Sequence, residues 1–268
     1  MDAVAAASDS DEGAFPERSI HRAARWGVID GLQREIDAGV DLDDPCEDGN
    51  ALNILCGDER VYGGSEENRI RGLRMLIEAG ASLNLDSMGL QPLATAAASG
   101  NLPVVQMLLE AGADVRETCE YGWTAVHSSV GADTYPSWFA GSEGPRRVRS
   151  AVNCTAALIA AGADLDAASR GGTTPLMVVA RLLAARPSNL STPLYAVLLR
   201  GGATLDRDKI EKRQGWTPYL DKVYQAGGWA RYAQAHRTRL VATFAPKLRL
   251  PADVIPLVVD FWANVGMY

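Results

Sequence analysis

The sequence predicts an all-α fold: a solenoid of helix-turn-helix units that are joined by β-hairpin fingers and closed by a C-terminal helical cap. Three observations lead to this prediction. A glycine motif recurs at the ends of helical stretches, a second motif opens them, and an apolar helical period connects the two. Each unit of such an array buries its apolar residues only against its neighbours, so the repeat sets the architecture.

The motif that ends each helical stretch contains a glycine at a fixed place. Its fullest copies are Asp37-Ala38-Gly39-Val40-Asp41 and Glu110-Ala111-Gly112-Ala113-Asp114. The glycines of the five copies are Gly39, Gly80, Gly112, Gly162 and Gly202. Glycine is favoured there because the residue after a helix often adopts a left-handed conformation.

The motif that opens each helical pair combines a capping residue, a proline and an apolar residue. Its copies are Gln91-Pro92-Leu93, Thr124-Ala125-Val126-His127, Thr174-Pro175-Leu176 and Thr217-Pro218-Tyr219, with weaker versions at Ser19-Ile20-His21 and Ala51-Leu52-Asn53. Threonine caps exposed helix N–H groups, and proline at the first helical position sacrifices no hydrogen bond. The preceding glycines, Gly49, Gly89, Gly122, Gly172 and Gly215, suit a tight turn. Pairs such as Leu108-Leu109 and Leu158-Ile159 supply the apolar stripe.

The spacing of the motif locates three inserts. The apolar position recurs at steps of 32, 41, 33, 50 and 43 residues, and the long steps place inserts near residues 57–68, 132–149 and 186–192. A charged linker, 206–213, is expected before the last unit. The predicted organisation is a disordered acidic tail over residues 1–16, a repeat domain over 17–228 and a helical cap over 229–268.

The two motifs together resemble ankyrin repeats, with five clear copies and a partial sixth. The resemblance implies a non-catalytic scaffold that binds a partner protein through its finger tips and the concave face of its first helices. It also implies a structural role for His21 and His127, because the family uses an imidazole at this position to tie neighbouring turns together by hydrogen bonds.

The same resemblance places one exposed position per finger between the turn glycine and the opening motif. Leu90, Trp123, Thr173 and Trp216 occupy that row and are predicted to contact a partner, although the tryptophans would also serve as packing residues between fingers. The insert near 132–149 is the other predicted recognition segment, through Tyr135, Trp138, Phe139, Arg146 and Arg147. The alternative is that this insert folds back over its own helices.

The C-terminal residues depart from the repeat. Trp229, Tyr232, His236, Leu240 and Phe244 share one face of a predicted amphipathic helix, and a second, apolar helix is expected around residues 254–262. We expect these helices to cap the open end of the stack. The alternative is a substrate-recruiting adaptor of a ubiquitin ligase, because the run after Leu240 is similar to a SOCS box and Leu250-Pro251-Ala252-Asp253-Val254 is similar to the opening of an F-box.

Composition restricts the partners. The formal net charge is −7 and the pI near 5.1, which disfavours nucleic acid and anionic membrane. No apolar run has the length of a membrane span, no leader peptide is expected, and four scattered cysteines indicate reduced thiols. The sequence thus predicts a monomer in the cytoplasm or nucleus that binds a protein, inserts into no membrane, needs no metal or cofactor and is not an enzyme, since no catalytic constellation is found.

Overall fold

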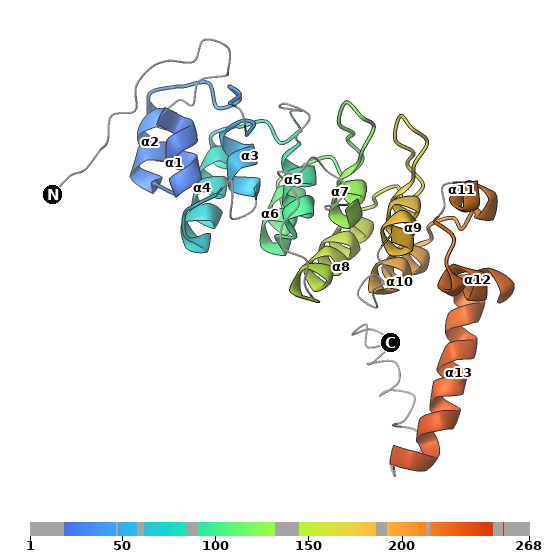
Figure 1. Ribbon diagram of the computed structural model, residues 1–268. Coiled ribbons are helices and arrows are strands. Elements are labelled where there is room, and N and C mark those ends of the chain that lie inside the picture. Colours follow the sequence, from blue (N-terminus) through green and yellow to red (C-terminus); the bar gives the residue numbers. More distant parts are fainter. Residues whose placement is uncertain are drawn as a thin grey trace. The chain divides into compact units, whose positions relative to one another are not determined.

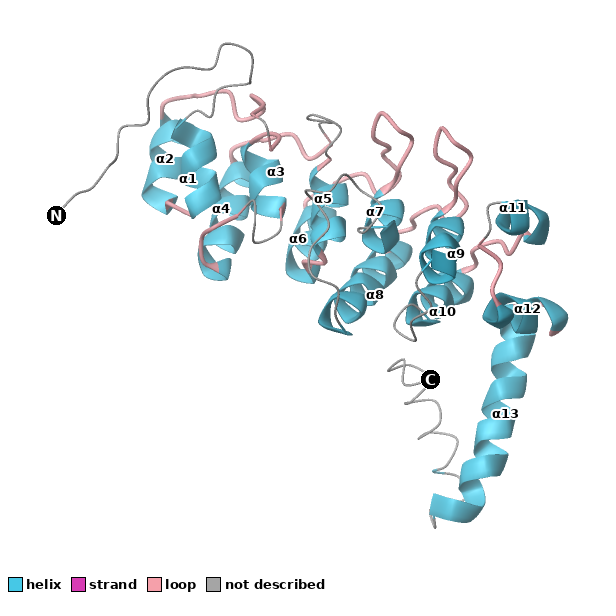
Figure 2. Cartoon of the chain, in the orientation of Figure 1, coloured by secondary structure: helices cyan, strands magenta, loops and turns pink. Residues whose placement is uncertain are grey.

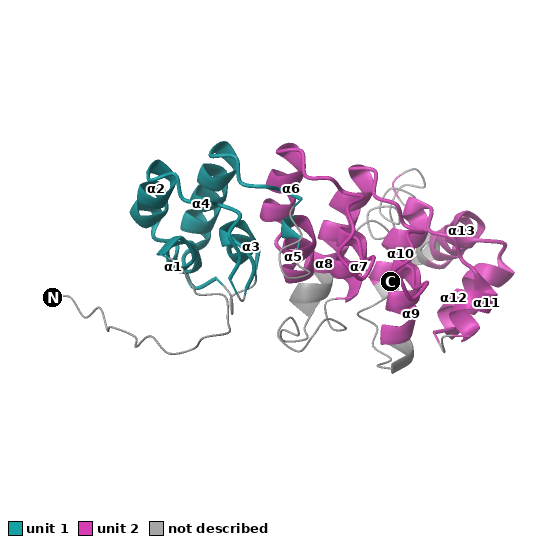
Figure 3. Cartoon of the chain, turned by 90° about the horizontal axis from the view of Figure 1, so that it is seen from above, with its two compact units in different colours: residues 1–92 teal, residues 93–268 magenta. Residues whose placement is uncertain are grey.

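The computed structural model describes residues 19–46, 48–57, 62–84, 91–131, 145–185, 192–212 and 215–248, together with Val254. Within these ranges every regular element is an α-helix, and the only β-type contact is an isolated bridge between Cys46 and Gly49. Figure 2 shows the helices alternating with loops. The all-α prediction is therefore confirmed, whereas β-hairpin structure in the fingers stays a prediction. The chain forms two compact units, residues 1–92 and 93–268 (Figure 3).

The first unit is built from two helical pairs. Its described helices are α1 (Ser19–Trp26), α2 (Ile29–Asp37), α3 (Ala51–Cys56) and α4 (Glu66–Glu78). α1 packs on α2 and α3, and α4 packs on the same two helices. The core is aliphatic, and its fully buried members include Ile20, Leu32, Leu52, Leu73 and Leu76.

The second unit continues the same pattern and adds a longer helix at its end (Figure 1). Its described helices are α5 (Pro92–Ser99, which begins at the unit boundary), α6 (Leu102–Glu110), α7 (Ala125–Gly131), α8 (Pro145–Ala160), α9 (Pro175–Ala185), α10 (Thr192–Gly201), α11 (Arg207–Lys212), α12 (Pro218–Gln225) and α13 (Trp229–Leu248). α8 is central, because it packs against α6, α7 and α10, while α13 contacts α10 and α12.

Both sequence motifs lie where they were predicted. The five closing glycines have left-handed φ angles of 70°, 91°, 95°, 87° and 104°. The prolines of the opening motif begin α5, α9 and α12, and the Thr217 side chain caps α12 by accepting a hydrogen bond from the Leu220 N–H at 3.4 Å. The first residue of each apolar pair is completely buried, as Leu108 and Leu158 show. Local rules of helix capping and periodicity therefore account for the repeats.

Most of the predicted charged linker 206–213 is helical, because α11 spans Arg207–Lys212. Asp206 accepts a hydrogen bond from the Lys209 N–H at 3.1 Å and so caps α11. Arg207 and Glu211 form an ion pair one turn apart, at 2.7 Å, and Ile210 is 1% exposed. A cap, a charge pair and one buried apolar residue are enough to hold this short helix against the unit.

The insert near 57–68 is not entirely a surface loop. α4 begins at Glu66, and Tyr62 is only 2% exposed. The buried Arg69 guanidinium lies over the Tyr62 ring, with its carbon 4.1 Å from the ring centroid. It also donates hydrogen bonds to the backbone oxygens of Leu55 and Gly57, at the end of α3. Arg69 thus fixes the insert to the first unit by satisfying carbonyls that a helix end leaves unpaired.

The C-terminal helix and the 132–149 insert are each described in part. α13 confirms the predicted C-terminal helix and runs from Trp229 to Leu248, four residues beyond Phe244. α8 begins at Pro145, so the last residues of the 132–149 insert are helical. The acidic tail over 1–16, the rest of that insert, most of the 186–192 insert and all of the second C-terminal helix except Val254 lie outside the described residues.

Candidate protein-binding surface

Two neighbouring fingers of the second unit, residues 114–124 and 164–174, form the candidate surface. Their turns have the same hydrogen bonds. The Cys119 N–H donates to the Trp123 oxygen at 3.0 Å, and the Ser169 N–H donates to the Thr173 oxygen at 3.0 Å. Gly122 and Gly172 occupy the same place in the two turns, with φ angles of 71° and 69°. The sequence pattern therefore reproduces one turn conformation in successive fingers.

The two fingers are joined directly through their backbones. The Arg170 N–H donates to the Tyr121 oxygen at 3.0 Å. A Cβ atom on Gly122 would lie 2.9 Å from the Arg170 nitrogen, so the second finger packs against the first where only glycine fits. Close backbone contact of this kind limits independent motion of the two finger tips.

His127 provides a second connection between these fingers. Its side chain is fully buried. Nδ1 accepts a hydrogen bond from the Thr124 N–H at 3.2 Å and lies 2.9 Å from the Thr124 hydroxyl. Nε2 lies 2.9 Å from the backbone oxygen of Thr173. Because the carbonyl can only accept, Nε2 carries the proton. Burial lowers the pKa of His127 and outweighs two smaller effects that raise it, the hydrogen bond to Thr173 and the charge of Asp164. The lowered pKa favours the neutral ring.

The first unit contains the same connection. His21 is fully buried on α1, and its Nε2 lies 2.9 Å from the backbone oxygen of Asp44 in the following finger. The structural role predicted for both histidines is therefore confirmed by their geometry: each ties the start of one helical pair to the next finger.

Aspartates supply a further connection that sequence reasoning missed. The Asp43 carboxylate accepts a hydrogen bond from the Ser82 N–H at 2.9 Å, and the Asp166 carboxylate accepts one from the Thr204 N–H at 2.8 Å. Each aspartate follows the closing glycine of its own repeat by four residues, and its partner follows the next closing glycine, Gly80 or Gly202, by two residues. The recurring Asp after Gly39 and Gly162 was visible in the sequence, but its partner 38 or 39 residues away was not.

The predicted finger row is only partly on the surface. Trp123 is half-buried, with its ring centroid 5.5 Å from that of His127, and Thr173 is 8% exposed. Trp216 is half-buried between Tyr224, whose ring centroid is 5.8 Å away, and the guanidinium of Arg207 at 5.2 Å. These contacts favour packing for both tryptophans. Leu90 lies outside the described residues.

The 132–149 insert contributes little to the described surface. Tyr135, Trp138 and Phe139 lie outside the described residues. Arg146 and Arg147 belong to the first turn of α8, although their side chains are not described.

Tyr121 is an exposed aromatic residue that does not belong to the predicted finger row. Its side chain is 61% exposed at the tip of its finger. Its position next to Gly122 was the available signal, because the middle of a tight turn faces solvent.

Reactive groups are scattered and mostly buried. All four cysteines are buried, and burial raises the pKa of both Cys56 and Cys154 to about 12. Within the described ranges, no three His, Cys, Asp or Glu side chains gather in a way that could hold a metal ion. No helix within those ranges has both the length and the apolar character of a membrane span.

Comparison with known proteins identifies the repeat. Residues 93–135 match the family model described as ankyrin repeats (many copies). An 87-residue stretch is 36% identical to protein phosphatase 1 regulatory subunit 27 of Mus musculus, which amounts to 32% of this chain and 46% of that protein. The chain thus spans less than half the length of this relative. The matched residues include α6, the first of the two fingers and α7, on which His127 lies.

Proposed function

Because this chain is an ankyrin-repeat protein, we propose that it is a non-catalytic scaffold that binds a partner protein through its finger tips and the concave face of its helices. The observation that carries the proposal is the backbone connection between the two neighbouring fingers, at Tyr121 and Arg170. A surface whose parts are already fixed loses little conformational entropy on binding, which favours affinity.

Tyr121 is the residue we propose as the anchor. Its ring is 61% exposed, while its backbone is held by the Arg170 hydrogen bond. Aromatic side chains on rigid backbones contribute much of the energy of protein interfaces. Glu120 and Arg170, both exposed, place opposite charges beside it and would orient the partner. Trp123, which is half-buried, and Tyr135 and its neighbours in the insert remain proposed contacts with a partner.

The experiment is capture of partners on the immobilised full-length chain, followed by measurement of the dissociation constant for a captured protein. Tyr121→Ala should weaken binding by about tenfold or more, the loss typical of an aromatic anchor. Tyr224→Ala is the matched control, because Tyr224 is 46% exposed but lies on α12. Equal affinity of the wild type and Tyr121→Ala for every captured protein would refute the finger proposal.

The named relative suggests the first partner to test. Its name describes a regulatory subunit of protein phosphatase 1, so we propose a catalytic subunit of that phosphatase as a candidate partner of this chain. The support is the 36% identity over 87 residues. Adding purified catalytic subunit to the immobilised chain tests it, and absence of retention at micromolar concentration would remove this candidate while leaving the scaffold proposal intact.

We further propose that the C-terminal helices close a repeat domain spanning residues 17–228. Support comes from the rings of Tyr195, Tyr219 and Tyr232, which link α10, α12 and α13 at centroid distances of 5.6 and 5.8 Å. The adaptor alternative requires the C-terminal residues to bind a ubiquitin-ligase subunit. Deleting residues 250–268 distinguishes the two: a cap predicts a lower unfolding midpoint, whereas an adaptor predicts unchanged stability and lost binding of elongin or a Skp-type subunit.

Two finer expectations complete the proposal. We propose that the chain is monomeric and located in the cytoplasm or nucleus. Light scattering on the purified protein tests the first expectation, and imaging of a tagged full-length chain tests the second. Nucleic acid stays disfavoured as a partner because of the net charge of −7.

A further inference from the structure

The C-terminal part of the second unit carries a local excess of positive charge. The residues from Lys222 to Ala252 include six Lys or Arg and no Asp or Glu, in a chain whose formal net charge is −7. The rest of the sequence is therefore more acidic than the total suggests, and the two charge types are segregated. Segregated charge is a common feature of surfaces that select an oppositely charged partner.

A chain of stacked rings fixes the geometry of this region. Tyr195 of α10 stacks on Tyr219 of α12, with ring centroids 5.6 Å apart. Tyr219 makes a T-shaped contact with Tyr232 of α13, with centroids 5.8 Å apart. Tyr232 in turn stacks on His236, with centroids 5.7 Å apart and planes inclined by 11°. These contacts hold α13 against α10 and α12, so the charged residues next to the rings have defined positions.

Cations from three helices surround this ring chain. Lys222 follows Tyr219 by three residues and Arg239 follows His236 by three, so each cation shares a helix face with a ring. Burial lowers the pKa of His236, and the charges of Arg239 and Lys222 lower it further. Burial raises the pKa of Tyr219, and Arg200 on α10 opposes that rise. We call Arg200, Lys222 and Arg239 the cationic junction.

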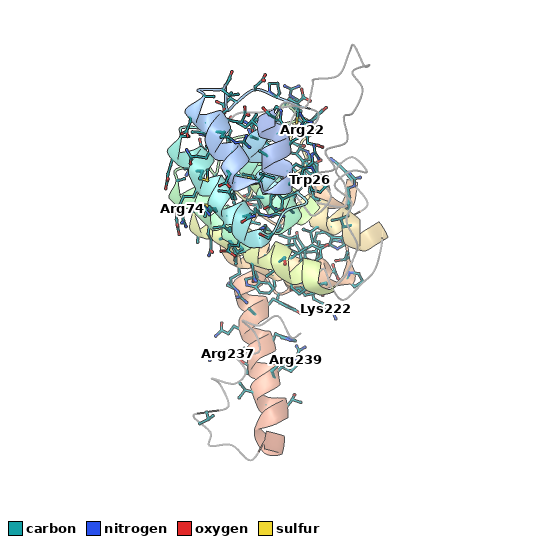
Figure 4. The ribbon with its side chains drawn as sticks, turned by 90° about the vertical axis from the view of Figure 1, so that its left-hand side faces the viewer. Arg22, Trp26, Arg74, Lys222, Arg237 and Arg239 are labelled. Atoms are coloured by element: carbon teal, nitrogen blue, oxygen red, sulfur yellow. The ribbon has the colours of Figure 1, made fainter. Side chains whose placement is uncertain are left out.

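All three residues of the cationic junction are exposed. Figure 4 shows Lys222 and Arg239 on the same side, whereas Arg237 points away from the other side of α13. This agrees with helical geometry, because residues two apart lie on opposite faces of a helix. One face of α13 therefore carries Arg239 and the ring-stacked His236. Arg237, on the opposite face, is a cation outside the cationic junction and serves as a control.

We propose that the cationic junction binds an Asp- and Glu-rich segment of a partner protein, as a second surface separate from the fingers. The acidic remainder of the chain would repel a long polyanion such as nucleic acid, while a short acidic segment contacts only the junction. Tyr219 and Tyr232 are half-buried and pack on each other in a T-shaped contact, which leaves little of either ring to enter a lipid bilayer.

The test measures fluorescence anisotropy of a fluorescein-labelled oligoglutamate peptide with the full-length protein. Lys222→Glu/Arg239→Glu should raise the dissociation constant about tenfold or more, because the variant removes two cations that attract the peptide and adds two carboxylates that repel it. Arg71→Glu/Arg74→Glu on α4 is the control, because it changes the net charge by the same amount. This variant and Arg237→Glu should each change the dissociation constant by less than about threefold, because screening weakens charges outside the site. Lys222→Gln/Arg239→Gln, with its thermal unfolding midpoint, shows whether a loss reflects misfolding.

Three results would overturn the proposal. The first is absence of peptide binding by the wild type at low salt. The second is equal weakening by the junction and α4 variants, which would indicate an unspecific effect of net charge. The third is tighter binding of an oligonucleotide or of vesicles containing phosphatidylserine than of the peptide. Tyr121→Ala should leave peptide binding unchanged, so failure of this proposal and failure of the finger surface are measured separately.

Discussion

Replacing His127 by alanine tests the idea that a neutral imidazole holds neighbouring fingers together. The substitution removes the partner of the Thr124 N–H and of the Thr173 oxygen, both in buried surroundings. Each buried group left unpaired costs about 1–3 kcal/mol, and the lost packing against Trp123 adds about 1 kcal/mol. We therefore expect the free energy of unfolding to fall by about 4 kcal/mol. His127→Gln, which retains an amide donor, should cause roughly half that loss.

Urea denaturation followed by tryptophan fluorescence measures this change, because Trp123 packs on His127. Hydrogen exchange gives a local reading. The Arg170 amide, which donates to Tyr121, should lose protection in His127→Ala if the imidazole maintains finger contact. A loss below about 1 kcal/mol, with the Arg170 amide still protected, would refute the reasoning, because a fully satisfied buried bridge cannot be removed so cheaply.

His127 should also make the free energy of unfolding depend on pH. Burial lowers the folded-state pKa of His127 below its usual 6.5, so the unfolded chain binds the proton first as the pH falls. The stabilising contribution of the neutral ring is complete above pH 6.5 and decreases as the pH falls toward the folded-state value. The difference in unfolding free energy between the wild type and His127→Gln should therefore be smaller at mildly acidic pH than at neutral pH. A difference independent of pH would contradict the assignment of a lowered pKa.

Further predictions concern packing and reactivity. Arg69→Met should lower the stability of the first unit by about 3 kcal/mol, because two carbonyls at the end of α3 lose a charged donor; loss of less than about 1 kcal/mol in urea melts would argue against it. Gly122→Ala should destabilise by about 2 kcal/mol through its left-handed φ and the contact with the Arg170 backbone, measured as a lower melting temperature. Cys56 and Cys154 should resist a thiol reagent in native protein and react in denaturant, and rapid native labelling would contradict their raised pKa values.

Features governed by neighbouring residues were predictable from the sequence. The closing glycines, the proline-started helices and the buried leucines follow from φ angles, capping and helical period, each of which depends on a few adjacent residues. The buried role of His127 was also predicted, but only through resemblance to a family, since nothing near it in the sequence identifies Thr173 as its partner 46 residues later.

The tertiary structure decided which of these residues remain available to a partner. Thr173 belongs to the finger row in the sequence, yet its side chain is buried, while Tyr121, which lies outside that row, is an exposed aromatic residue. Arg69 directly follows a polar insert in the sequence, yet it is 5% exposed, with its guanidinium over the Tyr62 ring. Burial depends on how one repeat packs on the next, and those contacts join residues dozens of positions apart. Local sequence therefore determined the repeat itself, whereas the packing between repeats determined its surface, because solvent exposure is a property of assembled neighbours and not of any one segment.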